Sequence, residues 1–156
     1  EAFYLRRKSL KKAGILNEIG ASLQWIFNLG KLLDDEDKFH ANIDYMNTQS
    51  FYHLLIIFLS DERSMQASLL QHFSNYISII LAQDDSHGVF KIDGTAWHHG
   101  GHYPAYALGA FEKIPQLIYI LSNSRFKISE AGHANFKKAF LIRNVSLGES
   151  CEFSKL

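Results

Sequence analysis

Apolar side chains recur every three or four residues along most of this chain, a spacing that favours α-helices over strands. One helix is predicted over roughly 15–33, where Ile15, Ile19, Leu23 and Ile26 share a face. Further helices are predicted at 49–60, about 61–82, 104–121 and 129–143. The segments between them, 33–48 and 83–102, are polar and are expected to be loops, and residues 143–156 are expected to be irregular. The pattern predicts an all-α fold built from antiparallel helical hairpins.

Several residues mark where these helices are expected to begin or bend. Ser60 or Asp61 is expected to cap the third helix, and Ser129 the fifth. Pro104 suits the first turn of the fourth helix, whereas Pro115 inside it predicts a kink or a break. No strand pair is predicted. The stretch "GVFKIDGT" (88–95) is expected to form only a short extended piece with an Asp-Gly turn.

The composition gives no sign of a nucleic-acid or membrane partner. The 156 residues carry sixteen basic and sixteen acidic side chains, so no overall positive field points to nucleic acid or to an anionic membrane. No apolar run approaches the roughly 20 residues of a membrane span, and one cysteine allows no internal disulfide. The chain has no signal peptide and no initiator methionine, so we expect it to be part of a longer protein.

Histidines and tyrosines gather just before the fourth predicted helix: His98, His99, His102, Tyr103 and Tyr106. Three interpretations are open from the residues alone. Imidazoles bind metals, although the spacing H-H-x-x-H matches no established zinc pattern. The residues are also typical of hydrogen-bonded structural side chains. The third interpretation is proton transfer by His99 on the loop and Tyr106 in the first helical turn, where free N–H groups favour a phenolate and an anionic substrate.

The segments "DGTAWHHGGHYPAY" (93–106), "FEKIPQLIYIL" (111–121) and "NFKKAF" (135–140) resemble the catalytic helical domain of the chondroitin sulfate ABC lyases, within polysaccharide lyase family 8. The stretch "IDYMNT" (43–48) is similar to the family as well. The family motif is matched at Asp93, Gly94, Thr95, Ala96, Trp97, His99, Gly101, Tyr103, Pro104 and Tyr106. The resemblance implies part of an incomplete (α/α) toroid, and it implies secretion or a periplasmic location.

The resemblance also implies β-elimination at a 4-linked uronate of chondroitin or dermatan sulfate, with hyaluronan as a further candidate, no cofactor and no metal. Tyr106 would serve as base and acid for glucuronate, and His99 would polarise the carboxylate or act as the base for the C5 epimer. Trp97 and Tyr103 suit stacking on sugar rings, with core packing as the alternative. His98, which stands where this group often has arginine, and His102 are assigned to substrate contact.

Asn47 and the end of the chain are the last features to compare with the family. Asn47 would contact substrate by resemblance, or would cap a helix. The family's catalytic arginine lies roughly fifty residues beyond the tyrosine, and residues 144–156 contain no arginine. Arg143 is expected to be a surface residue of the last helix. The chain is therefore expected to be an N-proximal piece of a lyase catalytic domain, or a helical module that binds acidic polysaccharide without turnover.

Overall fold

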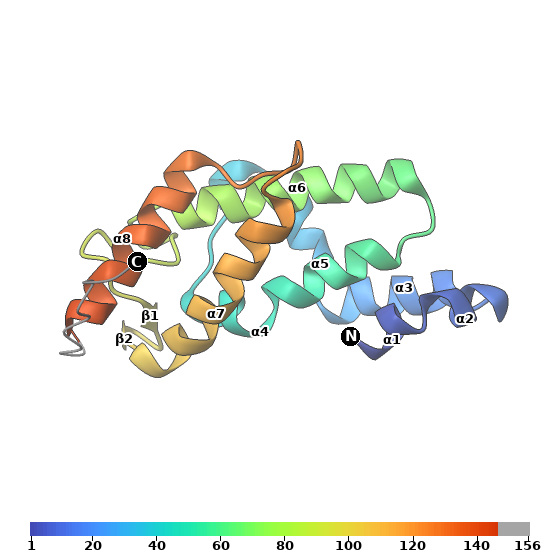
Figure 1. The fold of residues 1–156 in the computed structure, drawn as a ribbon, viewed down its shortest axis with the longest axis horizontal. Helices are drawn as coiled ribbons and strands as arrows, with labels where there is room; N and C mark the ends of the chain where they lie inside the picture. The colour runs from blue at the N-terminus through green and yellow to red at the C-terminus, as the bar shows by residue number, and fades with distance from the viewer. Residues whose placement is uncertain (147–156) are drawn as a thin grey trace, which may run out of the picture.

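The computed structural model describes residues 1–146, with side chains through 143. Nearly all the regular structure is helical, which confirms the all-α prediction (Figure 1). The helices are α1 Ala2–Leu5, α2 Arg7–Lys12, α3 Leu16–Ile26, α4 Ile43–Thr48, α5 Ser50–Leu59, α6 Arg63–Ala82, α7 Pro104–Leu121 and α8 Glu130–Ser146. Short 3₁₀ segments cover Leu29–Leu33 and Glu36–Lys38, and two strands of two residues each, β1 Trp97–His98 and β2 Gly101–His102, precede α7.

Antiparallel helix pairs organise the molecule. In Figure 1, α5 and α6 run in opposite directions around the short connection 60–62, and α7 and α8 run in opposite directions around the longer connection 122–129. The most extensive helix contacts are those of α4 with α7 and of α6 with α8, and α5 contacts both α6 and α7. Fully buried side chains from α4, α6 and α7, among them Met46, Phe73 and Ile114, form the shared core. The toroid of which these hairpins would be part stays a prediction.

Two helical predictions were wrong in extent. The helix expected over 15–33 ends at Ile26, because Asn28 takes a left-handed conformation (φ 49°) that an α-helix cannot continue through. The segment 33–48, expected to be a loop, contains α4. There the side-chain oxygen of Asn42 accepts a hydrogen bond from the Tyr45 N–H at 3.2 Å, which caps the helix.

The predicted start was wrong for α6 and is confirmed for α7 and α8. α6 begins at Arg63 after Glu62, so neither Ser60 nor Asp61 is its cap. Pro104 opens α7, as predicted, and Pro115 lies inside α7 without ending it, so the predicted break does not occur. The hydroxyl oxygen of Ser129 accepts a hydrogen bond from the Gly132 N–H at 3.1 Å, which confirms the cap of α8.

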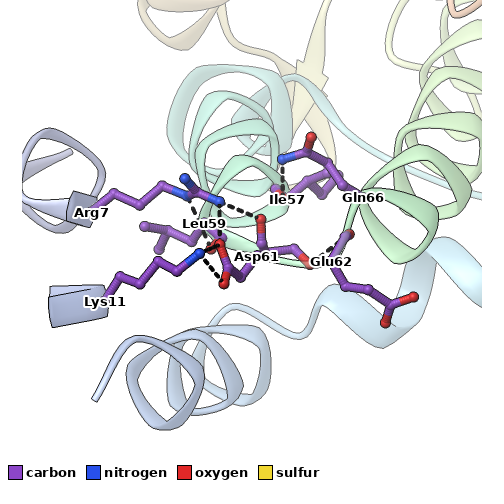
Figure 2. A network of polar contacts seen from close by, with 8 residues as sticks. Arg7, Lys11, Ile57, Leu59, Asp61, Glu62 and Gln66 are labelled. Atoms are coloured by element: carbon purple, nitrogen blue, oxygen red, sulfur yellow. Dashed lines mark hydrogen bonds and ion pairs between the residues drawn. The ribbon is translucent and has the colours of Figure 1, made fainter. Parts of the chain in front are cut away.

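The N-terminal helices are tied to the connection between α5 and α6 (Figure 2). Arg7 donates to the carbonyl of Ser60 at 2.9 Å and to Asp61 at 3.2 Å, and the ammonium of Lys11 lies 2.8 Å from the same carboxylate. Both cations lower the pKa of Asp61, chiefly through the hydrogen bond from Lys11. Two charges of the basic stretch 6–12 are thus engaged within the molecule.

α8 runs on to Ser146, beyond the predicted limit of 143, and the rest of the tail expected to be irregular, 147–156, lies outside the described residues. Within residues 1–146, no helix is both long and apolar enough to cross a membrane.

Candidate functional site

A small β-hairpin presents the first part of the candidate site. Trp97 pairs with His102 and His98 with Gly101, so the turn consists of His99 and Gly100. Both turn residues have positive φ, 51° and 77°, as in the type I′ turn whose twist matches that of the strands. The sequence did not predict this strand pair, because two-residue strands are too short to show alternation. The hairpin places His99 at its tip.

The base of the hairpin is fixed by its own polar side chains. Phe90 pairs with Ala96 across a turn in which Gly94 (φ 78°) donates to the Lys91 carbonyl at 2.7 Å, which confirms the predicted Asp-Gly turn. The hydroxyl of Thr95 donates to Asp93 at 2.6 Å and accepts from the Trp97 indole N–H at 2.8 Å. The bonds from Thr95 lower the pKa of Asp93. The orientation of the Trp97 ring is thus set from below.

The aromatic and imidazole rings of the cluster are in mutual contact. The ring centroids of His98 and His99 are 3.8 Å apart, and that of Tyr106 lies 5.0 Å from His98. Tyr103 stacks on Tyr106 at 4.7 Å and meets the rings of both histidines edge-on, at 6.0 and 6.1 Å. His98 therefore stands between His99 and Tyr106, the two residues predicted to transfer protons. Four of the predicted site residues are brought together here.

Exposure decides between two interpretations of the flat rings. Trp97 is 41% exposed and Tyr103 is 38% exposed, so neither is a core side chain and both offer a ring face to solvent. Tyr106 is half-buried and packs against the core from the first turn of α7. Its position near the helix N-terminus, with the positive end of the helix dipole, is as predicted from Pro104.

An open groove of about 650 Å³ runs along the hairpin. Its walls are residues 40–42, Ser86, residues 91–93 and residues 97–100. The Lys91 ammonium donates to the Asp85 and Gly88 carbonyls at 2.8 and 3.2 Å, and His40 Nδ1 bonds to the Lys38 carbonyl at 2.9 Å. The groove combines an exposed indole with imidazoles, which suits a polar chain that carries acidic groups.

Asn42 is a site residue that the sequence analysis missed. Its Nδ2 lies 3.0 Å from Nδ1 of His98, while its Oδ1 caps α4. An asparagine directly before the apolar residues of 43–46 is a signal for the start of a helix, which conflicts with the loop predicted over 33–48. The bond to His98, fifty-six positions away, has no local signal.

The other predicted residues do not line the groove: Tyr103 and Tyr106 contact its histidines from beside it, and the rest lie elsewhere. His102 lines a separate apolar cavity of about 300 Å³ between the hairpin base, α7 and α8. Arg143 lines the same cavity, with its guanidinium 5.0 Å from the Phe111 ring, so it is half-buried and not the surface residue predicted. Asn47 lies inside α4 and does not cap it; its amide meets α7 at Gly109, about one turn beyond Tyr106.

The donor set also bears on metal chemistry. Among residues 1–146, His, Cys, Asp and Glu form no group of three arranged to hold a metal ion. The arrangement instead provides imidazole donors next to a phenol at a helix N-terminus. Such a set can donate hydrogen bonds to a carboxylate and can carry a proton between two oxygen or carbon atoms.

Comparison with known proteins shows the family of the chain. The family model described as "Lyase, catalytic" matches residues 1–149. The chain is 34% identical over 146 residues to the chondroitin sulfate ABC endolyase of Proteus vulgaris, with 88% of this chain and 14% of that protein aligned. It is 32% identical to the chondroitin sulfate ABC exolyase of the same organism and 28% identical to that of Bacteroides thetaiotaomicron, over 90% of this chain each time. The chain spans 14% of the length of these relatives, and it belongs to the lyase family defined by this catalytic domain.

Proposed function

We propose that this chain supplies the His–Tyr part of a polysaccharide lyase that cleaves chondroitin or dermatan sulfate-type chains by β-elimination. The observation that carries the proposal is the contact of His98, His99, Tyr103 and Tyr106 beside the groove. The names of the three relatives support the substrate class. The family resemblance supports a secreted or periplasmic location.

The reaction assigns a step to each group. A 4-linked uronate lies in the groove, and imidazole N–H groups of His98 and His99 offset its carboxylate charge, which makes the C5 proton more acidic. The Tyr106 phenolate removes that proton, and the electron pair forms the C4=C5 bond as the C4–O bond breaks. Tyr106 then returns the proton to the leaving oxygen. The products are a 4,5-unsaturated uronate and a free hydroxyl, and no water is consumed.

The helix start supports the base role of Tyr106. An ordinary tyrosine has a pKa of about 10, so its phenolate needs nearby positive charge. The first turn of α7 provides unpaired backbone N–H groups and the positive dipole end. For the C5 epimer the proton lies on the opposite ring face, and His99 at the tip of the hairpin is proposed as the base there.

A second candidate is binding without turnover, favoured by the position of Arg143. Its guanidinium lies over Phe111 at the apolar cavity, and no arginine lines the groove within residues 1–143. In this candidate the exposed faces of Trp97 and Tyr103 hold the sugar chain, and the histidines hold its acidic groups. Charge offset would then be too weak for removal of a carbon-bound proton.

Ultraviolet absorbance separates the candidates, because the C4=C5 bond conjugated to the carboxylate absorbs where the substrate does not. Chondroitin sulfate is incubated with the chain, with Tyr106→Phe, and with the control Tyr119→Phe, whose side chain is on the same helix and 81% exposed. We expect an absorbance rise that is lost only in Tyr106→Phe. Saturable binding with a flat trace supports the second candidate, and neither signal refutes both.

A further inference from the structure

We infer that Asn42 is a positioning residue that fixes the imidazole proton of His98 on Nε2, so that His98 presents a fixed N–H donor to an anionic group in the groove. The part of this inference that concerns substrate rests on the proposed function. The part that concerns the tautomer stands on the hydrogen bonds of Asn42 alone.

The cap of α4 fixes which way the Asn42 amide faces. A backbone N–H can only donate, so the Asn42 atom 3.2 Å from the Tyr45 nitrogen must be the carbonyl oxygen Oδ1. The NH₂ group then faces His98, and it lies 3.0 Å from Nδ1. Since NH₂ can only donate, Nδ1 must be the acceptor, and the imidazole proton is on Nε2.

Charging of His98 conflicts with the same two bonds. An imidazolium carries protons on both nitrogens, so an N–H would face the NH₂ group of Asn42. Turning the amide over would relieve that conflict but would point the NH₂ group at the Tyr45 N–H and remove the cap. Asn42 therefore couples the neutral form of His98 to the start of α4, and the coupling runs between segments fifty-six residues apart.

The other groups around His98 do not compete with Asn42 for its Nδ1 atom. The rings in contact are His99, Tyr103 and Tyr106. The other titratable groups of the groove are occupied: the Asp93 carboxylate by Thr95, the Lys91 ammonium by the two backbone carbonyls described above, and Nδ1 of His40 by a carbonyl. Within the described residues, Nδ1 of His98 has Asn42 as its hydrogen-bond partner.

A division of roles between the two histidines follows. Their ring centroids are 3.8 Å apart, a distance at which two imidazolium charges repel strongly. With Nδ1 of His98 engaged by Asn42, the transfer of a proton falls to His99. His98 then acts through a single donor, Nε2–H, aimed at a carboxylate or sulfate oxygen.

The test is nitrogen-15 NMR of the histidine rings in the full chain, since the two ring nitrogens give different shifts when protonated and unprotonated. In the wild type we expect His98 with a protonated Nε2 and a bare Nδ1. Asn42→Asp keeps an oxygen to cap α4 but faces His98 with a carboxylate oxygen, so Nδ1 should gain a proton. Asn42→Ser keeps a capping oxygen that is too short to reach His98, and both tautomers should appear.

The control is Asn17→Asp, which adds the same charge on the exposed surface of α3. It should leave the His98 signals unchanged. A proton on Nδ1 in the wild type, or an unchanged tautomer in Asn42→Asp, overturns the assignment. Loss of α4 in Asn42→Asp is recognised from its amide shifts, and Asn42→Ser then decides.

The substrate part has a separate readout. Asn42→Asp should lower the affinity for chondroitin sulfate, or kcat/KM where turnover is seen, by roughly ten- to a hundredfold, the worth of one hydrogen bond to a charged group. A changed tautomer with unchanged binding and turnover overturns the role of His98 as a donor. A wild type that neither binds nor cleaves refutes the proposed function, while the NMR result on Asn42 still stands.

Discussion

His53 is expected to make the stability of this chain fall steeply in mild acid. Its side chain is fully buried on α5, with Nε2 2.8 Å from the Phe27 carbonyl and Nδ1 3.1 Å from the Tyr45 hydroxyl. Because a carbonyl only accepts, Nε2 carries the proton, and Tyr45 donates to Nδ1. Burial lowers the pKa of His53 from 6.5 to about 4; the bond to Phe27 opposes this and the nearby Lys31 adds to it.

The magnitude follows from the two proton affinities. Below pH 6.5 the unfolded chain protonates His53, whereas the folded chain stays neutral there until about pH 4. The unfolded state therefore binds more protons in this range, and the free energy of unfolding falls as the pH falls. A tenfold difference in proton affinity is worth about 1.4 kcal/mol, so the full loss from His53 is about 3 kcal/mol.

The assay is urea unfolding, followed by tryptophan fluorescence, at several pH values between 7.5 and 4. The variant His53→Gln keeps an N–H for Phe27 and an oxygen for Tyr45 but cannot be protonated. We expect its free energy of unfolding to fall about 3 kcal/mol less than that of the wild type over this range. The exposed His72 provides the control His72→Gln, which should follow the wild type. Parallel curves for His53→Gln and the wild type would refute the reasoning.

Three further outcomes test the packing. Gly109→Ala should cost about 1–2 kcal/mol despite better helix propensity, because its Cβ would overlap the Asn47 amide oxygen and lie 2.7 Å from Asn47 Cγ; in an Asn47→Ala background, urea unfolding should show the opposite sign. Asp61→Asn should speed amide hydrogen exchange in α2, which it anchors through Arg7 and Lys11, and leave α6 unchanged; uniform exchange would contradict this. Gly100→Ala, at φ 77°, should lower the melting temperature, whereas Gly20→Ala, with open space around it, should raise it.

The long helices were predictable because burial of one face leaves a period in the sequence that is visible over ten residues or more. α5, α6, α7 and α8 all extend far enough for this, and each is found close to its predicted place. α4 has six residues and the strands two, so neither shows a period. α4 exists because Asn42 caps it and because α7 packs along it, and the second cause is tertiary.

The candidate site divides in the same way. His98, His99, Tyr103 and Tyr106 could be singled out because they lie within nine positions at a predicted helix start, whereas the tight turn that brings the rings into contact was not predicted. The partner that orients His98 was not, because Asn42 reaches it across a groove whose other wall is a separate part of the chain. Local sequence thus gives the candidate residues, and only the packed structure gives the contact between Asn42 and His98.

The backbone at the tip of the hairpin takes an uncommon conformation, with a positive φ at His99. His99 and Asn28 are the non-glycine residues with positive φ within residues 1–146. Asparagine and histidine visit this conformation more often than most residues, for which it costs on the order of 1 kcal/mol. Glycines follow at 100 and 101, so the chain has the residue type that would relieve the strain directly beside the position that bears it. The turn holds the imidazole of His99 at its tip, against the ring of His98.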